Sequence, residues 1–285
     1  MDIKRKGNRK IPVQRQFQNI SCLVFPALEE TGIVSHLFST RLGGVSKGIF
    51  ASMNLSYTRG DEKAAVDENF NRIARAMGRK PEDFVCSDQT HTVTVRKVTE
   101  KDRGKGVVLP KDYTDVDGLI TDVPGIVLST FYADCVPLFI VDRVHFAIGL
   151  SHSGWRGTVS RMGQHTLLAM KEAFGTEASD VVVAVGPSIC KDCYEVSRDV
   201  AVEFAGSFSQ EILSSVLFEK GNGKYLLDLW EANRQIFLEA GVPEDNISVT
   251  DICTCCNPDY LFSHRASHGK RGNLGAFLSL NRGKP

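Results

Sequence analysis

Five short apolar stretches constrain the fold of this chain more than any other feature of its sequence. They read GIVLSTF, PLFIV, VHFAIGLS, DVVVAVG and NISVT, at residues 125–131, 137–141, 144–151, 180–186 and 246–250. Several are apolar on successive residues, which predicts strands with both faces buried. The tight link VDRV joins the second stretch to the third and predicts a hairpin of residues 137–141 and 144–151. Other elements must therefore cover both faces of the sheet.

Three further segments have the apolar spacing of helices. Residues 61–78 end at Gly78, residues 158–175 run from Thr158 as N-cap to Gly175, and residues 228–241 run from Asp228 to Gly241. Strands and helices are interspersed without a regular βα repeat, and no linker rich in Pro, Gly or Ser divides the chain. We therefore predict an α/β fold with a mixed sheet. Residues 1–30 would form an N-terminal arm and first strand, and residues 31–285 a single domain.

Charge and cysteine content restrict the expected partners and compartment. The 34 basic and 34 acidic residues cancel, and no apolar run reaches the roughly 20 residues of a membrane helix. We therefore expect small-molecule partners, with no nucleic acid and no membrane. Eight cysteines without a secretory segment predict reduced thiols and a cytoplasmic location. The basic segment MDIKRKGNRKIPVQR is expected to be a solvated, partly frayed arm.

Cys135 and His152 lie at the two ends of the expected hairpin, in ADCVP and SHSGWRGT. The ends of hairpin strands are adjacent, so both side chains can meet at one sheet edge. His91, in SDQTHTVTV, lies where the alternation of Val93 and Val95 predicts another strand to begin. One cysteine and two histidines form a catalytic zinc set with an open fourth position, and the same donors suit copper. A buried structural thiol and core histidines are the alternative.

Other motifs leave alternatives open. GWRGTVS follows His152 and offers either an anion site, with Arg156 beside a helix N-terminus, or a tight turn with a solvated arginine. The cysteines of CKDC and CTCC, residues 190–193 and 253–256, suit a structural zinc, a redox pair or reduced structural thiols, and we favour the last. The chain lacks GxGxxG after a strand, a P-loop, a GxSxG elbow and the HxE and PCxxC pair of zinc deaminases.

A set of motifs in fixed order resembles a known family. They are FSTRLGGVSKGIFASMNLS, GDEKAAVDENFNRIARAMG, QTH, DVDGLIT, ADCVP, SHSGWRGT, VGPSI, CYEV, CT and FSHRASHGKRGNLGAFLSL. Together they resemble the YfiH-type, laccase-domain or polyphenol oxidase-like family, also called peptidoglycan editing factor. The resemblance implies a single domain with helices outside two mixed β-sheets, in four layers α/β/β/α. It also implies metal ligands at His91, Cys135 and His152, the same three residues.

The resemblance implies an enzyme. Relatives phosphorolyse adenosine, inosine and methylthioadenosine, and deaminate adenosine. We expect a zinc-dependent purine nucleoside phosphorylase with adenosine deaminase side activity, acting on purine nucleosides and phosphate, with copper possible as the metal. The alternatives are a peptidoglycan-precursor editing hydrolase, a copper-dependent polyphenol oxidase and a non-catalytic metal-binding regulator. A full laccase needs a trinuclear copper cluster built from many imidazoles, which one Cys/His/His set cannot supply.

Five further residues are candidates for substrate binding. Arg72, Arg156 and Arg265 are expected to contact substrate or phosphate. Asp134 is expected to act as a proton shuttle or as a carboxylate that orients a histidine ligand. Asn54, in SMNLS, is expected either to line the same pocket or to cap a turn.

Overall fold

Two six-stranded sheets form the centre of the molecule. The computed structural model describes residues 3–281. The first sheet has the strand order β1 (Val13–Phe17), β2 (Ile20–Val24), β3 (Val34–Ser39), β15 (Leu274–Leu280), β7 (Val127–Tyr132) and β4 (Phe84–Cys86). The second has the order β14 (Ile247–Val249), β10 (Val181–Val185), β8 (Val136–Asp142), β9 (Ala147–Ser153), β6 (Gly118–Thr121) and β5 (Val95–Lys97).

Both sheets are mixed. The pairs β4/β7, β5/β6 and β10/β14 are parallel, and the other neighbours are antiparallel. A third, small sheet contains β11 (Glu195–Ser197), β13 (Lys224–Leu227) and β12 (Leu217–Gly221). The helices are α1 (Pro26–Glu29), α2 (Lys63–Ala76), α3 (Trp155–Val159), α4 (Met162–Phe174), α5 (Arg198–Ser207), α6 (Gln210–Val216) and α7 (Leu229–Glu239).

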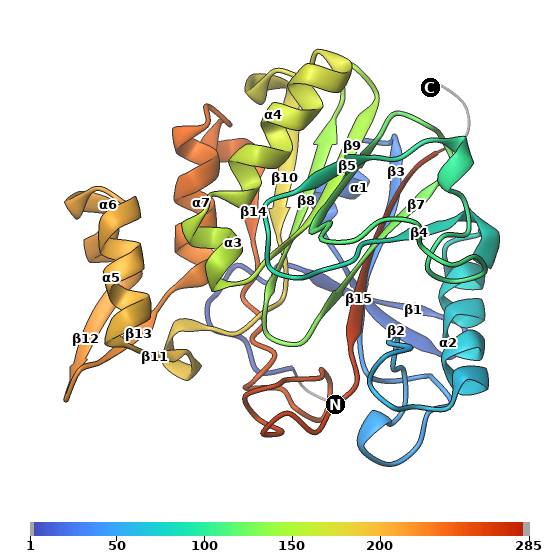
Figure 1. The fold of residues 1–285 in the computed structure, drawn as a ribbon, viewed down its shortest axis with the longest axis horizontal. Helices are drawn as coiled ribbons and strands as arrows, with labels where there is room; N and C mark the ends of the chain where they lie inside the picture. The colour runs from blue at the N-terminus through green and yellow to red at the C-terminus, as the bar shows by residue number, and fades with distance from the viewer. Residues whose placement is uncertain (1–2, 282–285) are drawn as a thin grey trace.

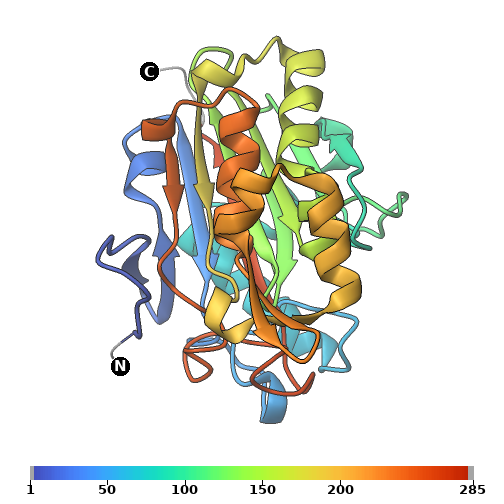
Figure 2. The same cartoon turned by 90° about the vertical axis from the view of Figure 1, so that its left-hand side faces the viewer.

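The sheets and helices form four layers (Figure 1). Side chains such as Phe38, Phe139 and Leu150 fill the space between the two sheets. Helix α2 covers the outer face of the first sheet through Phe70 and Ile73. Helices α4 and α7 cover the outer face of the second, as the turned view shows (Figure 2). The α/β/β/α arrangement expected from the resemblance is therefore confirmed.

Several local predictions are confirmed. Strands β8 and β9 form the expected hairpin. Helix α2 ends just before Gly78, whose φ of 63° is the left-handed conformation that favours glycine after a helix. Helix α7 is capped by Asp228, whose carboxylate accepts hydrogen bonds from the backbone N–H groups of Trp230 and Glu231. Within residues 3–281, no helix combines the length and the apolarity that a membrane crossing needs.

Two local predictions around the site are wrong. Thr158 is not an N-cap, because the chain already turns into α3 at Gly154 and the Thr158 hydroxyl instead bonds the Ser153 hydroxyl at 2.9 Å. Helix α4 begins only after Arg161, which adopts a left-handed conformation. The strand expected to begin at His91 begins at Val95, because residues 90–92 bend around a buried carboxylate.

The described part of the N-terminal arm is docked rather than frayed. The backbone N–H of Lys4 donates to the side-chain oxygen of Asn257 at 2.7 Å, and Arg5 forms an ion pair with the buried carboxylate of Asp251. The backbone N–H of Lys6 donates to the carbonyl of Asp251 at 2.8 Å. Strand β2 then pairs with β3. Residues 3–30 are therefore integrated into the first sheet and packed against the loop at residues 251–257.

Candidate active site

The hairpin register brings Cys135 and His152 together. Pro137 of β8 lies opposite His152 of β9, so Cys135, just before β8, comes next to the imidazole. His91 reaches the same point from the loop between β4 and β5. The potential ligand atoms of the three residues lie within 4.8 Å of one another. The two imidazole rings have centroids 5.0 Å apart at an interplanar angle of 75°.

Asp117 fixes this arrangement, and sequence analysis did not single it out. Its carboxylate is fully buried and accepts a hydrogen bond from His152 Nδ1 at 2.7 Å. Because a carboxylate only accepts, the proton lies on Nδ1, and Nε2 is left to bind a metal. The same carboxylate accepts three consecutive backbone N–H groups, from residues 90, 91 and 92, at 3.0, 3.2 and 2.9 Å. Asp117 therefore orients one ring and holds the loop that carries the other.

The electrostatics of the group favour a thiolate. Burial alone would raise the pKa of Cys135, but the adjacent His152 and His91 outweigh burial and lower it to about 6. Burial alone would lower the pKa of His152, but Cys135 and Asp117 outweigh it and raise this pKa to about 9. Without a metal the pair is thus a thiolate beside an imidazolium. A bound cation would replace the imidazolium proton as the partner of the thiolate.

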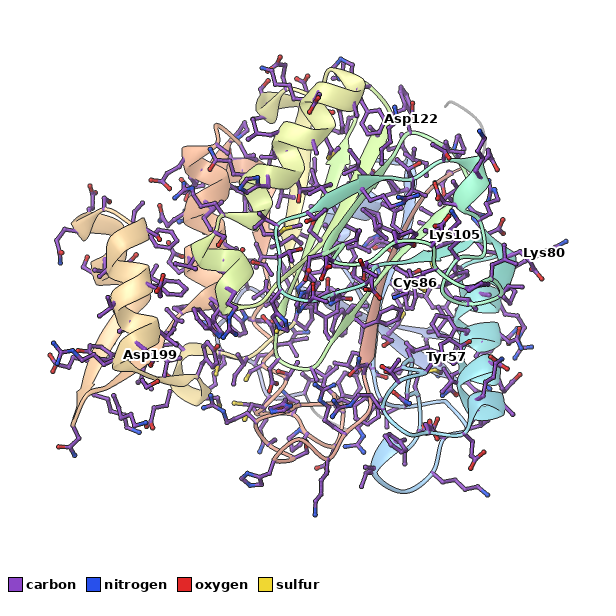
Figure 3. The ribbon with its side chains drawn as sticks, in the orientation of Figure 1. Tyr57, Lys80, Cys86, Lys105, Asp122 and Asp199 are labelled. Carbon is purple, nitrogen blue, oxygen red and sulfur yellow. The ribbon has the colours of Figure 1, made fainter. Side chains whose placement is uncertain are left out.

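A cavity of about 440 Å³ opens beside the three residues, all of which line it. The volume is within the range of small-molecule sites. Aromatic side chains of Tyr57, Phe131 and Tyr132 contribute to the wall. Tyr57 and Cys86, labelled in Figure 3, lie on the side of the cavity nearer α2, where Tyr57 stacks on Phe70 with ring centroids 5.6 Å apart.

Two arginines, Arg59 and Arg271, line the cavity. Arg59 donates to the carbonyl of Gly269 at 2.9 Å, and Arg271 donates to the side-chain oxygen of Asn273. Within residues 3–281, neither forms an ion pair, and the buried Nε of Arg271 has no hydrogen-bond partner. Burial and the nearby charge of Arg59 lower the pKa of Arg271 to about 10. In the described part of the chain, neither guanidinium group therefore has a carboxylate at ion-pair distance.

The three arginines chosen from the sequence lie elsewhere. Arg72 donates to Glu68, one helical turn away, and to the carbonyl of Gly43. Arg156 is exposed and lies over the ring of Trp155, which agrees with the solvated arginine, the second of the two alternatives for GWRGTVS. The guanidinium of Arg265 donates to two carbonyl oxygens, of residues 193 and 195. None of the three lines the cavity.

Asp134 and Asn54 do not line the cavity but form hydrogen bonds to segments around it. Asp134 contacts neither His91 nor His152. Its carboxylate accepts hydrogen bonds from the Thr254 hydroxyl at 2.6 Å and the backbone N–H of Arg265 at 2.7 Å. Asp134 is therefore not a partner of either histidine, because these two loops occupy its oxygens, and its role as a proton shuttle stays a prediction.

Asn54 is fully buried, and its side-chain oxygen accepts the backbone N–H groups of Ser56 and Asn273, at 3.1 and 2.9 Å. Ser56 and Asn273 line the cavity, and Asn54 itself does not. Of the two expectations for Asn54, the turn-capping one agrees with these contacts.

The donor set fits a single metal ion. One thiolate and two imidazoles are a recognised set for catalytic zinc, and the side of the group that faces the cavity leaves room for a further ligand. His91 is exposed, Cys135 is half-buried and His152 is buried. Substrate could therefore approach from the cavity while Asp117 supports the ligands from the protein side.

Comparisons with known proteins agree with this geometry. Residues 35–281 match the family model described as multi-copper polyphenol oxidoreductase laccase. The purine nucleoside phosphorylase YlmD of Geobacillus stearothermophilus is 38% identical over 84% of this chain and 88% of its own length. The adenosine deaminase RL5 of an unknown prokaryotic organism is 33% identical over 80% of this chain and 87% of its own.

A solved structure shares the fold. The crystal structure of Bacillus licheniformis hypothetical protein YfiH matches with a TM-score of 0.87 and 30% identity, covering 94% of this chain and 99% of that one. The family predicted from the motifs is confirmed by sequence and by fold, and the chain belongs to the family described as multi-copper polyphenol oxidoreductase laccase.

Proposed function

We propose that this chain is a zinc-dependent purine nucleoside phosphorylase that acts on adenosine, inosine and methylthioadenosine, with adenosine deaminase side activity. The observation that carries the proposal is one cavity lined both by the His91, Cys135 and His152 group and by two arginines without ion-pair partners in the described residues. The names of the relatives, purine nucleoside phosphorylase and adenosine deaminase, support the two proposed reactions.

The proposed reaction needs an anion site and a polarised substrate. In phosphorolysis, the bond between ribose C1′ and the purine nitrogen breaks, a bond from C1′ to a phosphate oxygen forms, and the base leaves with the electron pair and takes a proton. Arg59 and Arg271 would hold the phosphate, because one guanidinium group can donate two parallel hydrogen bonds to two phosphate oxygens. A bound zinc would supply Lewis acidity at the site.

The remaining cavity residues would place the nucleoside. The wall formed by Tyr57, Phe131 and Tyr132 presents aromatic surface to a flat purine ring. With a metal bound, Asp117 would keep the His152 proton on Nδ1 and so leave Nε2 to the metal. The eight cysteines, all free, fit the reducing cytoplasm in which we expect the enzyme to act.

Product analysis tests the proposal. Zinc-loaded protein is incubated with adenosine, with and without phosphate, and adenine, inosine and ribose 1-phosphate are measured. We expect adenine and ribose 1-phosphate only with phosphate, and inosine in either case. Absence of all three products refutes the proposal. Oxidation of phenols by copper-loaded protein, without purine turnover, would favour the copper-dependent polyphenol oxidase instead.

Paired arginine variants test the anion site. Arg271→Ala should raise the KM for phosphate by about 10-fold or more, as expected for the loss of a charge-assisted contact of at least about 1.4 kcal/mol. Arg72→Ala is the matched control, because Arg72 lies on α2 and pairs with Glu68 outside the cavity. An equal effect of both variants, or of neither, contradicts the assignment of Arg271.

A further inference from the structure

Four cysteines outside the candidate active site form a second cluster. Cys190 and Cys193 come from the segment that links β10 to β11, and Cys253 and Cys256 come from the loop after β14. The segments are joined because the backbone N–H of Thr254 donates to the carbonyl of Ser188 at 3.0 Å. All four sulfur atoms lie within 4.8 Å of one another. Neither the candidate reaction nor the cavity uses them.

The distances between the sulfurs fit a tetrahedral ion. Cys193 Sγ and Cys256 Sγ are 3.4 Å apart, and Cys190 Sγ and Cys256 Sγ are 4.0 Å apart. A zinc–sulfur bond of about 2.3 Å gives a tetrahedron whose sulfurs are about 3.8 Å apart. A disulfide would need a separation of only about 2.05 Å. The arrangement is therefore close to tetrathiolate geometry.

Two backbone N–H groups and the ammonium group of Lys6 place positive charge near the cluster. The backbone N–H groups of Cys190 and Cys256 donate to Cys253 Sγ at 3.2 and 3.4 Å, which stabilises negative charge on this sulfur. The ammonium group of Lys6 interacts electrostatically with Cys190 and Cys256 and forms an ion pair with Asp192 at 2.9 Å. A zinc ion with four thiolates carries a net charge of −2, which this cation partly offsets.

We propose that Cys190, Cys193, Cys253 and Cys256 bind a structural zinc ion. Two Cys-x-x-Cys pairs that converge from separate segments are a common ligand set for structural zinc, and four protein ligands close the coordination shell. Binding of Zn²⁺ as the tetrathiolate displaces the protons of those thiols that are still protonated. The proposal replaces the sequence-based preference for reduced structural thiols, and it is independent of the proposed function.

The ion would stabilise three segments that meet behind the active site. Asn257, which follows the last ligand, donates to the carbonyl of Cys253 at 2.8 Å and holds Lys4 of the N-terminal arm. Thr254 donates to Asp134, the residue before Cys135. The zinc site would thus hold the arm and the loop at residues 251–257 against the segment that precedes β8 and contains Cys135.

Metal analysis of the full chain tests the site. The background variant Cys135→Ala removes the central ligand of the active-site group, so that one bound zinc per chain after dialysis reports the cysteine cluster. Adding C193S and C256S should reduce this zinc to near zero. Cobalt-loaded Cys135→Ala protein should show the intense charge-transfer absorption of tetrahedral cobalt thiolate, and the triple variant should lose it.

Cys255→Ser is the matched control, because Cys255 lies in the same loop but outside the four-sulfur group. In the Cys135→Ala background it should retain the zinc and the cobalt spectrum. If the triple variant does not fold, chelation of the Cys135→Ala protein should lower its thermal unfolding temperature, and added zinc should restore it. The proposal is overturned by unchanged zinc in a folded triple variant, by bound iron in place of zinc, or by a disulfide among the four cysteines in freshly purified protein.

Discussion

Replacing Asp117 by Asn should weaken metal binding without removing a metal ligand. Asp117 accepts hydrogen bonds from His152 Nδ1 and from the backbone N–H groups of residues 90, 91 and 92. Asparagine has one acceptor oxygen and one donating amide nitrogen. If its oxygen faces the backbone groups, its amide faces His152 and favours the tautomer with the proton on Nε2. If it faces His152, the backbone N–H groups of residues 90 and 92 lose their acceptor, whereas that of His91 keeps it.

The expected losses of metal affinity and of folding stability can both be estimated. Loss of a carboxylate that orients a metal-binding histidine typically lowers metal affinity by about 10–100-fold, which corresponds to about 1.4–2.7 kcal/mol. A buried N–H left without an acceptor costs about 1–3 kcal/mol of folding stability. For a chain of this size, each kcal/mol lowers the unfolding temperature by about 2–4 °C. We therefore expect weaker zinc binding together with a moderate loss of stability.

Zinc affinity is measured by competition with a chromophoric chelator, and folding by circular dichroism. Asp115→Asn is the matched control: it makes the same change two residues earlier, where the carboxylate accepts the Thr90 hydroxyl at 2.7 Å and contacts no histidine. The control should bind zinc as the parent does. A folded Asp117→Asn protein with the parental zinc affinity would refute the orienting role of Asp117.

Three other changes test the site and its support. Gly154→Ala should lower zinc affinity in the same titration, because a Cβ there would lie 3.0 Å from both Cys135 Sγ and His91 Cδ2; unchanged affinity contradicts this. Asp134→Asn should lower the unfolding temperature but change zinc affinity less than 3-fold, since Asp134 contacts no histidine; a 10-fold loss would restore its predicted role. Burial lowers the pKa of His36 to about 3, so the histidine stays neutral in the folded chain at pH 5 but is protonated in the unfolded chain below pH 6.5. The free energy of unfolding should therefore fall by about 2 kcal/mol by pH 5. Urea unfolding should show this loss of stability in the parent but not in His36→Gln. If the stability of the two proteins falls equally between pH 7 and pH 5, His36 does not contribute to the loss.

The hairpin was predictable because its signals are local. The apolar stretches and the link VDRV define β8 and β9, and their pairing brings Cys135 next to His152. Asp117 was not predictable in the same way, because its contacts join residues 90–92 to His152 across two loops and a strand. A carboxylate in DVDG directly before an apolar strand was the available signal.

The arginines show why residue type alone is a weak guide. The pair Glu68 and Arg72 has the i, i+4 spacing of a salt bridge on a helix surface, which argued against a free cation at Arg72. Arg271 lies in KRGNLG, where glycine and asparagine predict only a loop. Its burial beside Arg59 depends on the return of the chain into β15, a contact that spacing does not encode.

The two cysteine-containing groups differ in how they could use a metal. Cys135 is joined by two imidazoles, of which one is exposed, and the group borders a cavity. Three ligands at a cavity leave a coordination position that a substrate can reach, which catalysis requires. The four cysteines border no part of that cavity and would complete the coordination shell by themselves. Because Asp134, the residue before Cys135, accepts the hydroxyl of Thr254 in the loop at residues 251–257, a metal bound at the closed site would help to hold the open site in shape.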